Sequence, residues 1–372
     1  MSRPPEIIVV GAGIIGCAVA YELARRGASV QIVDERTAGM GATHASAGIL
    51  APYVEAEAGT AFLDLTVRGL NLYDEFIARV TTDGGMAIPY RRSGTIQVAT
   101  DPERMSALRN LAARLEAQGV QLGVLDAQTV RAEEPELGAE VAGGLLVPTH
   151  GFVAVADLMR SLAAAARRLG AGLIEGRRVR RIARAGDDLT VETDRGSLAA
   201  NAVVVAAGSW SGQIEIAGVA ARIPMRPVRG QLLRLAWKGP PLRRVLWSDR
   251  CYLVPWDDGT LLVGATVEEA GFDERTTVAG VRDLLDAACE LVPHAWTAGF
   301  LEARVGLRPA SGDDLPVIGR SRLLPNLMYA TGHFRNGVLL APLTARLVAD
   351  AMLENIVDPA IDLLRPDRFG NL

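Results

Sequence analysis

The sequence predicts an α/β protein in which a Rossmann-type domain carries an inserted α+β domain built on an antiparallel sheet. Three observations support this fold class. A strand, a helix and a second strand follow one another at the start of the chain, hairpin-forming strands occupy its middle, and a strand, a glycine-rich turn and a long helix come near its end. The 372 residues are enough for about two domains of roughly 150 residues each.

The first element group is a βαβ unit. Residues 7–10 read as a buried strand, residues 14–26 as a helix that ends at Gly27, and residues 30–33 as a second strand closed by Asp34. Two strands joined by a helix within about 30 residues form a parallel pair.

The turn between the first strand and the helix has the spacing GxGxxG, with Gly11, Gly13 and Gly16 as its glycines. Gly11 permits the tight turn, Gly13 lets a pyrophosphate approach the backbone, and Gly16 allows close packing of helix on strand. The helix N-terminus supplies free N–H groups and partial positive charge to phosphates. Asp34 is placed to accept hydrogen bonds from ribose hydroxyls. We therefore predict a Rossmann-type dinucleotide site.

The next segments alternate between helices and strands. Residues 101–118 predict an amphipathic helix with Asp101 as N-cap and Pro102 at its first position, and residues 157–169 predict another helix, stopped by Gly170. Residues 189–193 and 202–206 read as strands joined by a turn at 194–196.

The stretch from 228 to 267 has a different character. Residues 231–235, 251–255 and 261–265 read as strands, the last two joined by a hairpin turn at 257–259. Residues 328–353 return to a strand, a turn and a helix. We therefore predict a discontinuous nucleotide-binding domain of residues 1–85, 146–215 and 307–372, and a substrate domain of residues 86–145 and 216–306.

Composition excludes several classes of protein. Apolar residues make up 49% of the chain, the net charge is −4, and no basic stripe suited to nucleic acid is present. Cys17, Cys251 and Cys289 lie far apart without metal-ligand spacing, so we predict no metal site and reduced thiols. We expect no secretory leader, including in the polar lead of residues 1–5, no membrane span, and a cytoplasmic location.

Three features favour FAD over a nicotinamide cofactor. Small residues fill positions 41–50, the strand at 203–208 ends in small residues at Gly208, and residues 332–337 lead into a helix at 338–352 whose N-terminus can stabilise the negative charge of reduced flavin. A nicotinamide-dependent dehydrogenase and a non-catalytic nucleotide-binding subunit are the alternatives from other classes.

The motifs GAGIIG, ASAGILAP, VVVAAGSWS, GLRPASGDDLPVIGR and ATGHFRNGVLLAP resemble those of the glycine oxidases of thiazole biosynthesis, which belong to the D-amino-acid oxidase group of FAD enzymes. The resemblance covers nearly the whole chain. It implies that non-covalent FAD contacts Ile14, Ile15, Asp34, Glu35, Ala42, Thr43, Ala47, Gly48, Ile49, Val179, His333, Phe334, Arg335, Asn336, Gly337, Val338 and Leu339.

The resemblance also implies that the substrate contacts Arg308, Arg335 and Tyr252. Arginine presents a planar fork that matches a carboxylate, so Arg308 fits an amino-acid substrate; a structural ion pair with Asp313 or Asp314 is the alternative. Two positions depart from the family: Arg250 stands where a histidine is frequent, and Val267 where a methionine occurs. The identity of the preferred amino acid stays open.

The implied reaction is oxidation of a small amino acid such as glycine, sarcosine or a small D-amino acid. A hydride passes to flavin and then O2 yields H2O2, an oxo acid and ammonia. None of the four histidines lies in a nucleophile or zinc motif. The runner-up is an FAD-dependent D-amino-acid or proline-type dehydrogenase that uses a quinone or carrier. A sarcosine oxidase is a third option, but the flavin-linking cysteine of that family is missing, since no cysteine follows Cys289. A homo-oligomer is expected.

Overall fold

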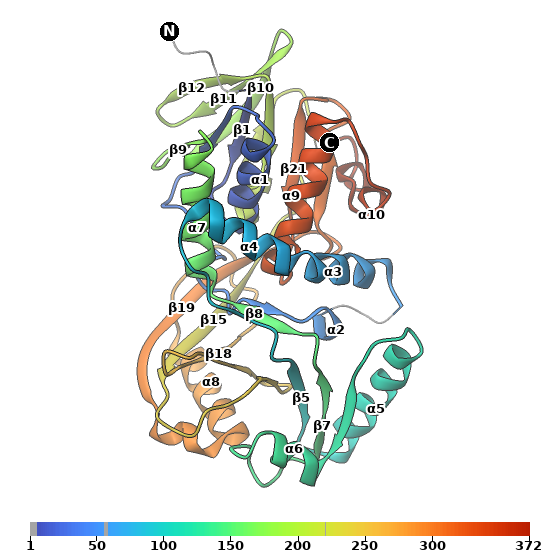
Figure 1. Ribbon diagram of the computed structural model, residues 1–372. Helices are drawn as coiled ribbons and strands as arrows, with labels where there is room; N and C mark the ends of the chain where they lie inside the picture. The colour runs from blue at the N-terminus through green and yellow to red at the C-terminus, as the bar shows by residue number, and fades with distance from the viewer. Residues whose placement is uncertain (1–5, 56–58, 220) are drawn as a thin grey trace.

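The computed structural model describes residues 6–55, 59–219 and 221–372. The polar lead predicted at residues 1–5 lies outside them. Figure 1 shows two stacked bodies: a sheet with helices around β1 and α9 in the upper half, and a second sheet around β5 and β15 in the lower half. The helices α3 (Ala61–Asn71) and α4 (Tyr73–Gly84) run across the junction between the two.

The upper sheet has six strands in the order β20 (Val317–Arg320), β21 (Leu327–Thr331), β13 (Ala202–Val205), β1 (Ile7–Val10), β2 (Val30–Val33) and β9 (Gly172–Ile174). All neighbours are parallel except the edge pair β20–β21. The run of four buried apolar residues in β1 suits a strand that is covered on both faces. Segments from both ends of the chain thus belong to one sheet, with β13 between β1 and β21.

The two faces of this sheet are covered differently. One face packs against the helices α1 (Ile14–Arg25), α7 (Val155–Arg168) and α9 (Gly337–Leu353). The other face packs against a four-stranded sheet in the order β12 (Gly196–Ala200), β11 (Asp188–Thr193), β10 (Val179–Ala185) and β14 (Glu215–Ile216). A three-layer arrangement results, with cores on both sides of the central sheet.

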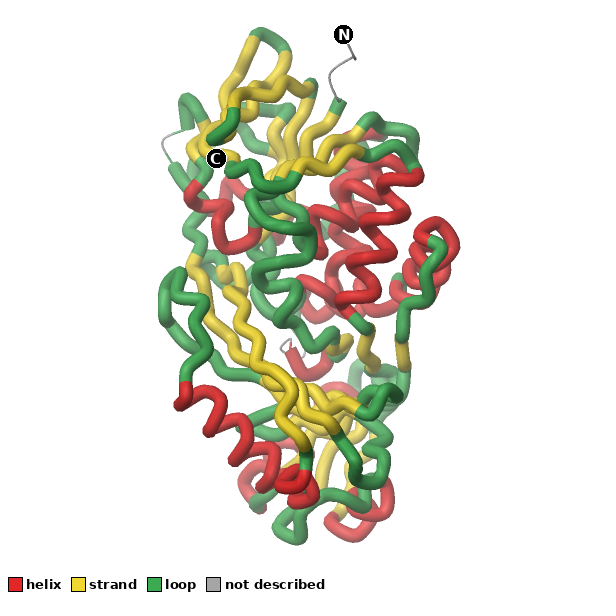
Figure 2. The backbone as a smooth tube through the Cα atoms, turned by 90° about the vertical axis from the view of Figure 1, so that its left-hand side faces the viewer, coloured by secondary structure: helices red, strands yellow, loops and turns green. Residues whose placement is uncertain are grey.

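The lower sheet has eight strands in the order β19 (Gly299–Ala310), β15 (Arg226–Ala236), β18 (Thr260–Gly264), β17 (Tyr252–Pro255), β16 (Val245–Trp247), β5 (Thr95–Ala99), β7 (Gly143–Val147) and β6 (Gly123–Asp126). Only β16 and β5 pair in parallel. Its face is covered by α8 (Val278–Leu291) and α6 (Ala127–Glu133), with α5 (Pro102–Glu116) beside β7. Figure 2 shows the long strands of this sheet rising toward the upper body.

Short elements complete the chain. A three-stranded sheet joins β3 (Ile49–Leu50), β8 (Gly151–Val153) and β4 (Tyr90–Arg91) between the two bodies. The remaining helices are α2 (Pro52–Glu55), α10 (Ile361–Leu364) and the 3₁₀ turns Gly208–Gln213, Pro293–Thr297 and Pro366–Phe369. No helix of the described residues combines the length and apolarity needed to cross a bilayer.

The predicted fold class is confirmed, and most predicted elements lie within two residues of their expected bounds. Asp101 caps α5 through its side chain, which accepts a hydrogen bond from Arg104 N, and Pro102 opens the helix. One expectation was wrong. The turn at 194–196 does not lead directly to the strand at 202; it leads to β12, whose residues are mostly exposed and therefore lack a hydrophobic pattern.

Candidate active site

A cavity of about 630 Å³ opens at the carboxyl ends of the parallel strands β1, β2, β13 and β21, where this class of sheet binds its ligands. Its opposite wall comes from β15, β17, β18 and β19 of the lower sheet. Arg308, Tyr252, Arg335 and every residue predicted to contact the cofactor except Gly16 line this cavity. The structure therefore brings together segments that the sequence spreads over most of the chain.

The glycine-rich loop is closely packed at two of its three glycines. Gly11 has φ +107°, and a Cβ there would collide with the carbonyl of Ala206. A Cβ at Gly16 would collide with the carbonyl of Gly11, so Gly16 lets α1 lie against the loop and does not reach the cavity. Gly13 takes the N-cap position of α1 and has no side chain to cap it; Ile14 N donates to Thr43 Oγ1 at 3.1 Å, and the first residues of the helix line the cavity.

Asp34 holds the turn that follows β2. Its carboxylate accepts hydrogen bonds from Ala12 N at 2.6 Å and Arg36 N at 2.7 Å. Burial raises the pKa of this carboxyl, although both hydrogen bonds favour the charged form. Each oxygen keeps a second lone pair for a ligand hydroxyl. Glu35 is exposed beside it and faces Arg178 at 3.8 Å.

The segment before α9 places a helix N-terminus at the cavity. Asn336 occupies the N-cap position, and its Oδ1 is buried with no hydrogen-bond partner among the described residues. Phe334 adopts a left-handed conformation with φ +46° and donates its N–H to Pro309 O. His333 is buried, its Nε2 lies 2.9 Å from Thr344 Oγ1, and burial lowers its pKa to about 3. His333 is therefore neutral near pH 7, and it lines the cavity.

Arg308 lies in β19, and its side chain crosses the neighbouring strand β15 over Gly230. A Cβ at Gly230 would overlap both terminal nitrogens of the guanidinium. Nη1 donates to Thr266 O at 3.0 Å and to Arg229 O at 3.4 Å. Asp313 and Asp314, the alternative partners considered from the sequence, bind Arg368 and Arg226 instead. The guanidinium therefore faces the cavity, held by backbone carbonyls.

Tyr252 reaches the same wall of the cavity from β17. A Cβ at Gly264, its partner in β18, would collide with the phenol ring. Its ring lies 5.1 Å from that of Trp247, which also lines the cavity. Arg335 is exposed at the surface of the cavity and lies 5.6 Å from the Phe334 ring. Three aromatic rings and two guanidinium groups thus border one end of the space.

Sequence reasoning missed several residues of this cavity. Trp247, Trp210 and Arg36 line it, and the Arg36 guanidinium stacks on Trp210 at 4.5 Å. Gly230 and Gly264 also line it. A glycine inside a strand frequently marks the close approach of another group, so these two glycines were a usable signal. Trp247 and Trp210 carried no such signal, because a lone tryptophan fits any core.

The positions that depart from the family pattern also border the cavity. Val267 is 53% exposed, and the exposed Arg250 forms an ion pair with Glu290. Cys251 lines the cavity as well, but burial raises its pKa to about 11, so the thiol stays protonated and unreactive near pH 7. Among the described residues, no group of three or more metal-ligating side chains is present.

Comparison with known proteins agrees with this geometry. The model of the family described as "DAO: FAD dependent oxidoreductase" matches residues 6–351. The chain belongs to this family. Membership of this family identifies the cofactor as FAD, and the cavity fits FAD. A glycine loop and a helix N-terminus suit the phosphates of the cofactor, and Asn336 Oδ1, which has no partner among the described residues, can accept a hydrogen bond from it.

Two named relatives are similar over nearly the whole of this chain. The glycine oxidase of Geobacillus kaustophilus is 33% identical over 352 residues, which cover 94% of this chain and 93% of that protein. Its crystal structure superimposes with a TM-score of 0.93 and covers 100% of this chain and 99% of that one. The bifunctional protein ThiO/ThiG of Synechocystis sp. is 35% identical over 99% of this chain. The match covers 55% of that relative, so the chain spans about half of its length.

Proposed function

We propose that this FAD-dependent oxidoreductase oxidises the amine of a small amino acid, with glycine as the first candidate. Glycine, O2 and water would give glyoxylate, ammonia and H2O2 through an imine. The observation that carries the proposal is Arg308, a guanidinium fixed over Gly230 at the wall of the cofactor cavity. Similarity to proteins named glycine oxidase supports this choice of substrate, and the resemblance to enzymes of thiazole biosynthesis supports a role in that pathway.

Arg308 binds the substrate carboxylate with its guanidinium fork, and Tyr252 donates its hydroxyl to the same group. Arg335 adds positive charge at the open end. When bound, FAD accepts a hydride from the α-carbon, and O2 takes up the electrons. The aromatic rings of Trp247 and Tyr252 shield the reacting carbon from bulk water while the hydride is transferred, and the imine is hydrolysed to glyoxylate and ammonia afterwards.

The same proposal assigns the cofactor contacts. Gly11, Gly13, Asp34 and Glu35 would hold the nucleotide part of FAD, and residues 42–49 and 333–339 would hold the flavin, with Val179 and Gly208 as further contacts. Gly16 acts indirectly, through packing. The cofactor is held without a covalent bond, because the cavity-lining Cys251 is a buried thiol. We place the cofactor domain at 1–85, 146–215 and 307–372 and the substrate domain at 86–145 and 216–306.

The proposal is tested by following H2O2 release and amine oxidation with glycine, sarcosine, D-amino acids and L-amino acids. Arg308→Ala should lower kcat/KM for the best amino acid by about 30- to 1,000-fold, or roughly 2–4 kcal/mol, because a charged pair in a partly dry cavity is lost. Arg308→Lys should restore only part of the loss, since lysine keeps the charge without the fork.

Ethylamine, which lacks a carboxylate, serves as the control substrate. It should be a poor substrate of the wild type and respond little to Arg308→Ala. Full activity of Arg308→Ala on amino acids would contradict the proposal. Amino-acid oxidation that reduces a quinone but yields no H2O2 would favour the dehydrogenase reading instead.

The cytoplasmic location and the homo-oligomeric state stay predictions.

A further inference from the structure

The segment between β18 and α8, residues 265–277, forms the frame behind Arg308. Where β18 leaves the sheet after Gly264, this segment continues along the edge of β15. Thr266 N donates to Gln231 O at 3.2 Å, Glu268 N donates to Arg229 O at 3.0 Å, and Arg229 N donates back to Glu268 O at 2.9 Å. Residues 266–268 thus act as a short added strand next to the substrate wall.

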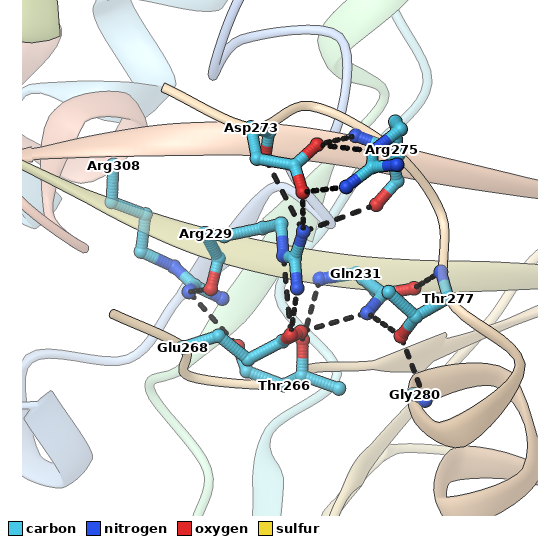
Figure 3. Close-up of polar contacts among 9 residues, drawn as sticks. All are labelled: Arg229, Gln231, Thr266, Glu268, Asp273, Arg275, Thr277, Gly280 and Arg308. Atoms are coloured by element: carbon cyan, nitrogen blue, oxygen red, sulfur yellow. Dashed lines mark hydrogen bonds and ion pairs between the residues drawn. The ribbon is translucent and has the colours of Figure 1, made fainter. Parts of the chain in front are cut away.

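Side chains behind the sheet fasten this added strand. Arg229 is only 7% exposed and donates from Nε at 3.1 Å and Nη2 at 2.5 Å to Glu268 Oε2. Its Nη1 donates to Asp273 Oδ2 at 3.0 Å. Gln231 donates from Nε2 to Glu268 Oε1 at 2.7 Å, and Thr266 Oγ1 donates to the same oxygen. Figure 3 shows these groups converging on the Glu268 carboxylate.

Arg308 touches this frame from the other side. Side chains alternate along a strand, so Arg229 and Gln231 lie on one face of β15, and Gly230, which the Arg308 guanidinium covers, lies on the other. Both carbonyls that accept from Arg308 Nη1, those of Thr266 and Arg229, belong to the peptides that the frame fixes. The arrangement is visible in Figure 3, where Arg308 reaches the carbonyls of Arg229 and Thr266.

We propose that Glu268 is a positioning residue for substrate binding: by clamping Arg229, Gln231 and Thr266, it fixes the two carbonyls that aim Arg308 at the substrate carboxylate. This inference rests on the proposed function. It assigns to Glu268 no contact with substrate or flavin. Its effect passes through the backbone of the added strand.

The physical reason lies in the flexibility and the charge of arginine. An arginine side chain has many rotamers, and the two carbonyls remove that freedom before substrate arrives, so less entropy is lost on binding. Arg229 and Arg308 occupy adjacent strands, and their like charges would repel. Glu268 and Asp273 neutralise Arg229, so no uncompensated cation is buried behind Arg308.

The test uses the FAD-loaded enzyme and three substitutions in this frame. Glu268→Gln keeps the size of the side chain but places an amide N–H₂ group next to the N–H donors of Arg229 and Gln231. Thr266→Val removes the hydroxyl that accepts from Gln231 N and donates to Glu268, and Thr266→Ser keeps that hydroxyl. Glu192→Gln is the matched control, since it breaks an ion pair with Arg181 in the four-stranded sheet.

Acetate, the smallest carboxylate that cannot be oxidised, is titrated while the flavin absorbance is followed, and KM and kcat are measured with glycine. Glu268→Gln and Thr266→Val should raise the acetate dissociation constant and the glycine KM about tenfold, as expected for a weakened hydrogen bond to a charged group, with a smaller change in kcat. Thr266→Ser and Glu192→Gln should behave as wild type, and ethylamine oxidation should not change.

Two outcomes separate this inference from the function on which it rests. If wild type binds acetate and oxidises glycine, and both Glu268→Gln and Thr266→Val do so equally well, Glu268 has no positioning role. If wild type itself shows no carboxylate binding and no amino-acid oxidation, the proposed function falls, and the positioning role with it. A loss of bound FAD in parallel with the loss of acetate affinity would assign Glu268 to the fold and also overturn the inference.

Discussion

At the scale of single residues, His150 is an unusual group in the core. It is 0% exposed, its ring stacks on Tyr53 at 5.4 Å, and neither ring nitrogen has a hydrogen-bond partner among the described residues. Burial, followed by the nearby charge of Arg92, lowers its pKa to about 3. A histidine that is neutral when folded but charged when unfolded destabilises the protein in acid.

We predict that His150→Phe stabilises the enzyme and reduces its acid sensitivity. The pKa of His150 is about 3 in the folded protein and about 6.5 in the unfolded chain. Keeping the histidine neutral therefore costs the folded state nothing above pH 6.5, and the free energy of unfolding decreases as the pH falls from 6.5 toward 3. The wild type should lose about 2 kcal/mol through this group between pH 8 and pH 5. Phenylalanine removes that loss, and at pH 8 it should gain about 1–3 kcal/mol from the absent unpaired nitrogens.

Urea unfolding midpoints of the FAD-bound enzyme at pH 8 and pH 5 measure both effects. His294→Phe is the matched control, since His294 is partly exposed and lies 3.4 Å from Glu136. His333 has the same sign of shift, so part of the acid sensitivity should survive in His150→Phe. A variant less stable than wild type at both pH values would show that ordered water satisfies the His150 nitrogens.

Site residues that belong to a local motif could be predicted from the sequence, whereas those placed by the register between strands could not. Arg308 was predicted because its motif resembles a known family. Gly230 and Gly264 were not, because their role depends on the register that sets Gly230 beneath Arg308 and Gly264 beside Tyr252. The clamp at Glu268 was missed for the same reason: its partners lie 37 and 39 residues away along the chain.

At the scale of elements, the N-terminus of α9 lines the cavity at the end where we propose that the flavin binds. We predict that Asn336→Asp lowers the two-electron potential of the bound flavin. A carboxylate at this buried position offsets the positive end of the helix and disfavours the extra charge of the reduced cofactor. A shift of about 30 mV corresponds to roughly 1.4 kcal/mol for two electrons.

A potentiometric titration against a reference dye measures this shift. Asn110→Asp provides the control, because Asn110 is an exposed residue of α5. Equal potentials in wild type and Asn336→Asp would mean that the α9 terminus does not act on the flavin.

Elements with a strong local signal could be predicted to within two residues. The strands β1 and β2 have the bounds expected from their apolar runs, and the Asp101–Pro102 start of α5 follows from its capping chemistry. The two-residue strands β3 and β4 could not be predicted, because pairing with β8 alone defines them. The strand β12 is mostly exposed and lacks the apolar periodicity on which such predictions rest.

At the scale of the whole molecule, the cofactor cavity joins the two sheets, so bound FAD should stabilise the entire fold. We predict that the thermal midpoint of the apoprotein rises with FAD concentration. A ligand at 100 times its dissociation constant adds about 2.7 kcal/mol. Differential scanning fluorimetry over a range of FAD concentrations measures this, with NAD as the comparison. Equal midpoints with and without FAD, or a rise with NAD alone, would contradict the prediction.

The central position of β1 beside β13, with β21 next to β13, also bears on how the enzyme is made. A ribosome delivers β1 and the glycine loop before α9, which follows on the order of tens of seconds later. Until then the cavity lacks residues 333–339, and the apolar face of α1 that packs against α9 is uncovered. The nascent chain is thus exposed to aggregation until α9 has been synthesised, and a complete cavity for the cofactor forms only after that point.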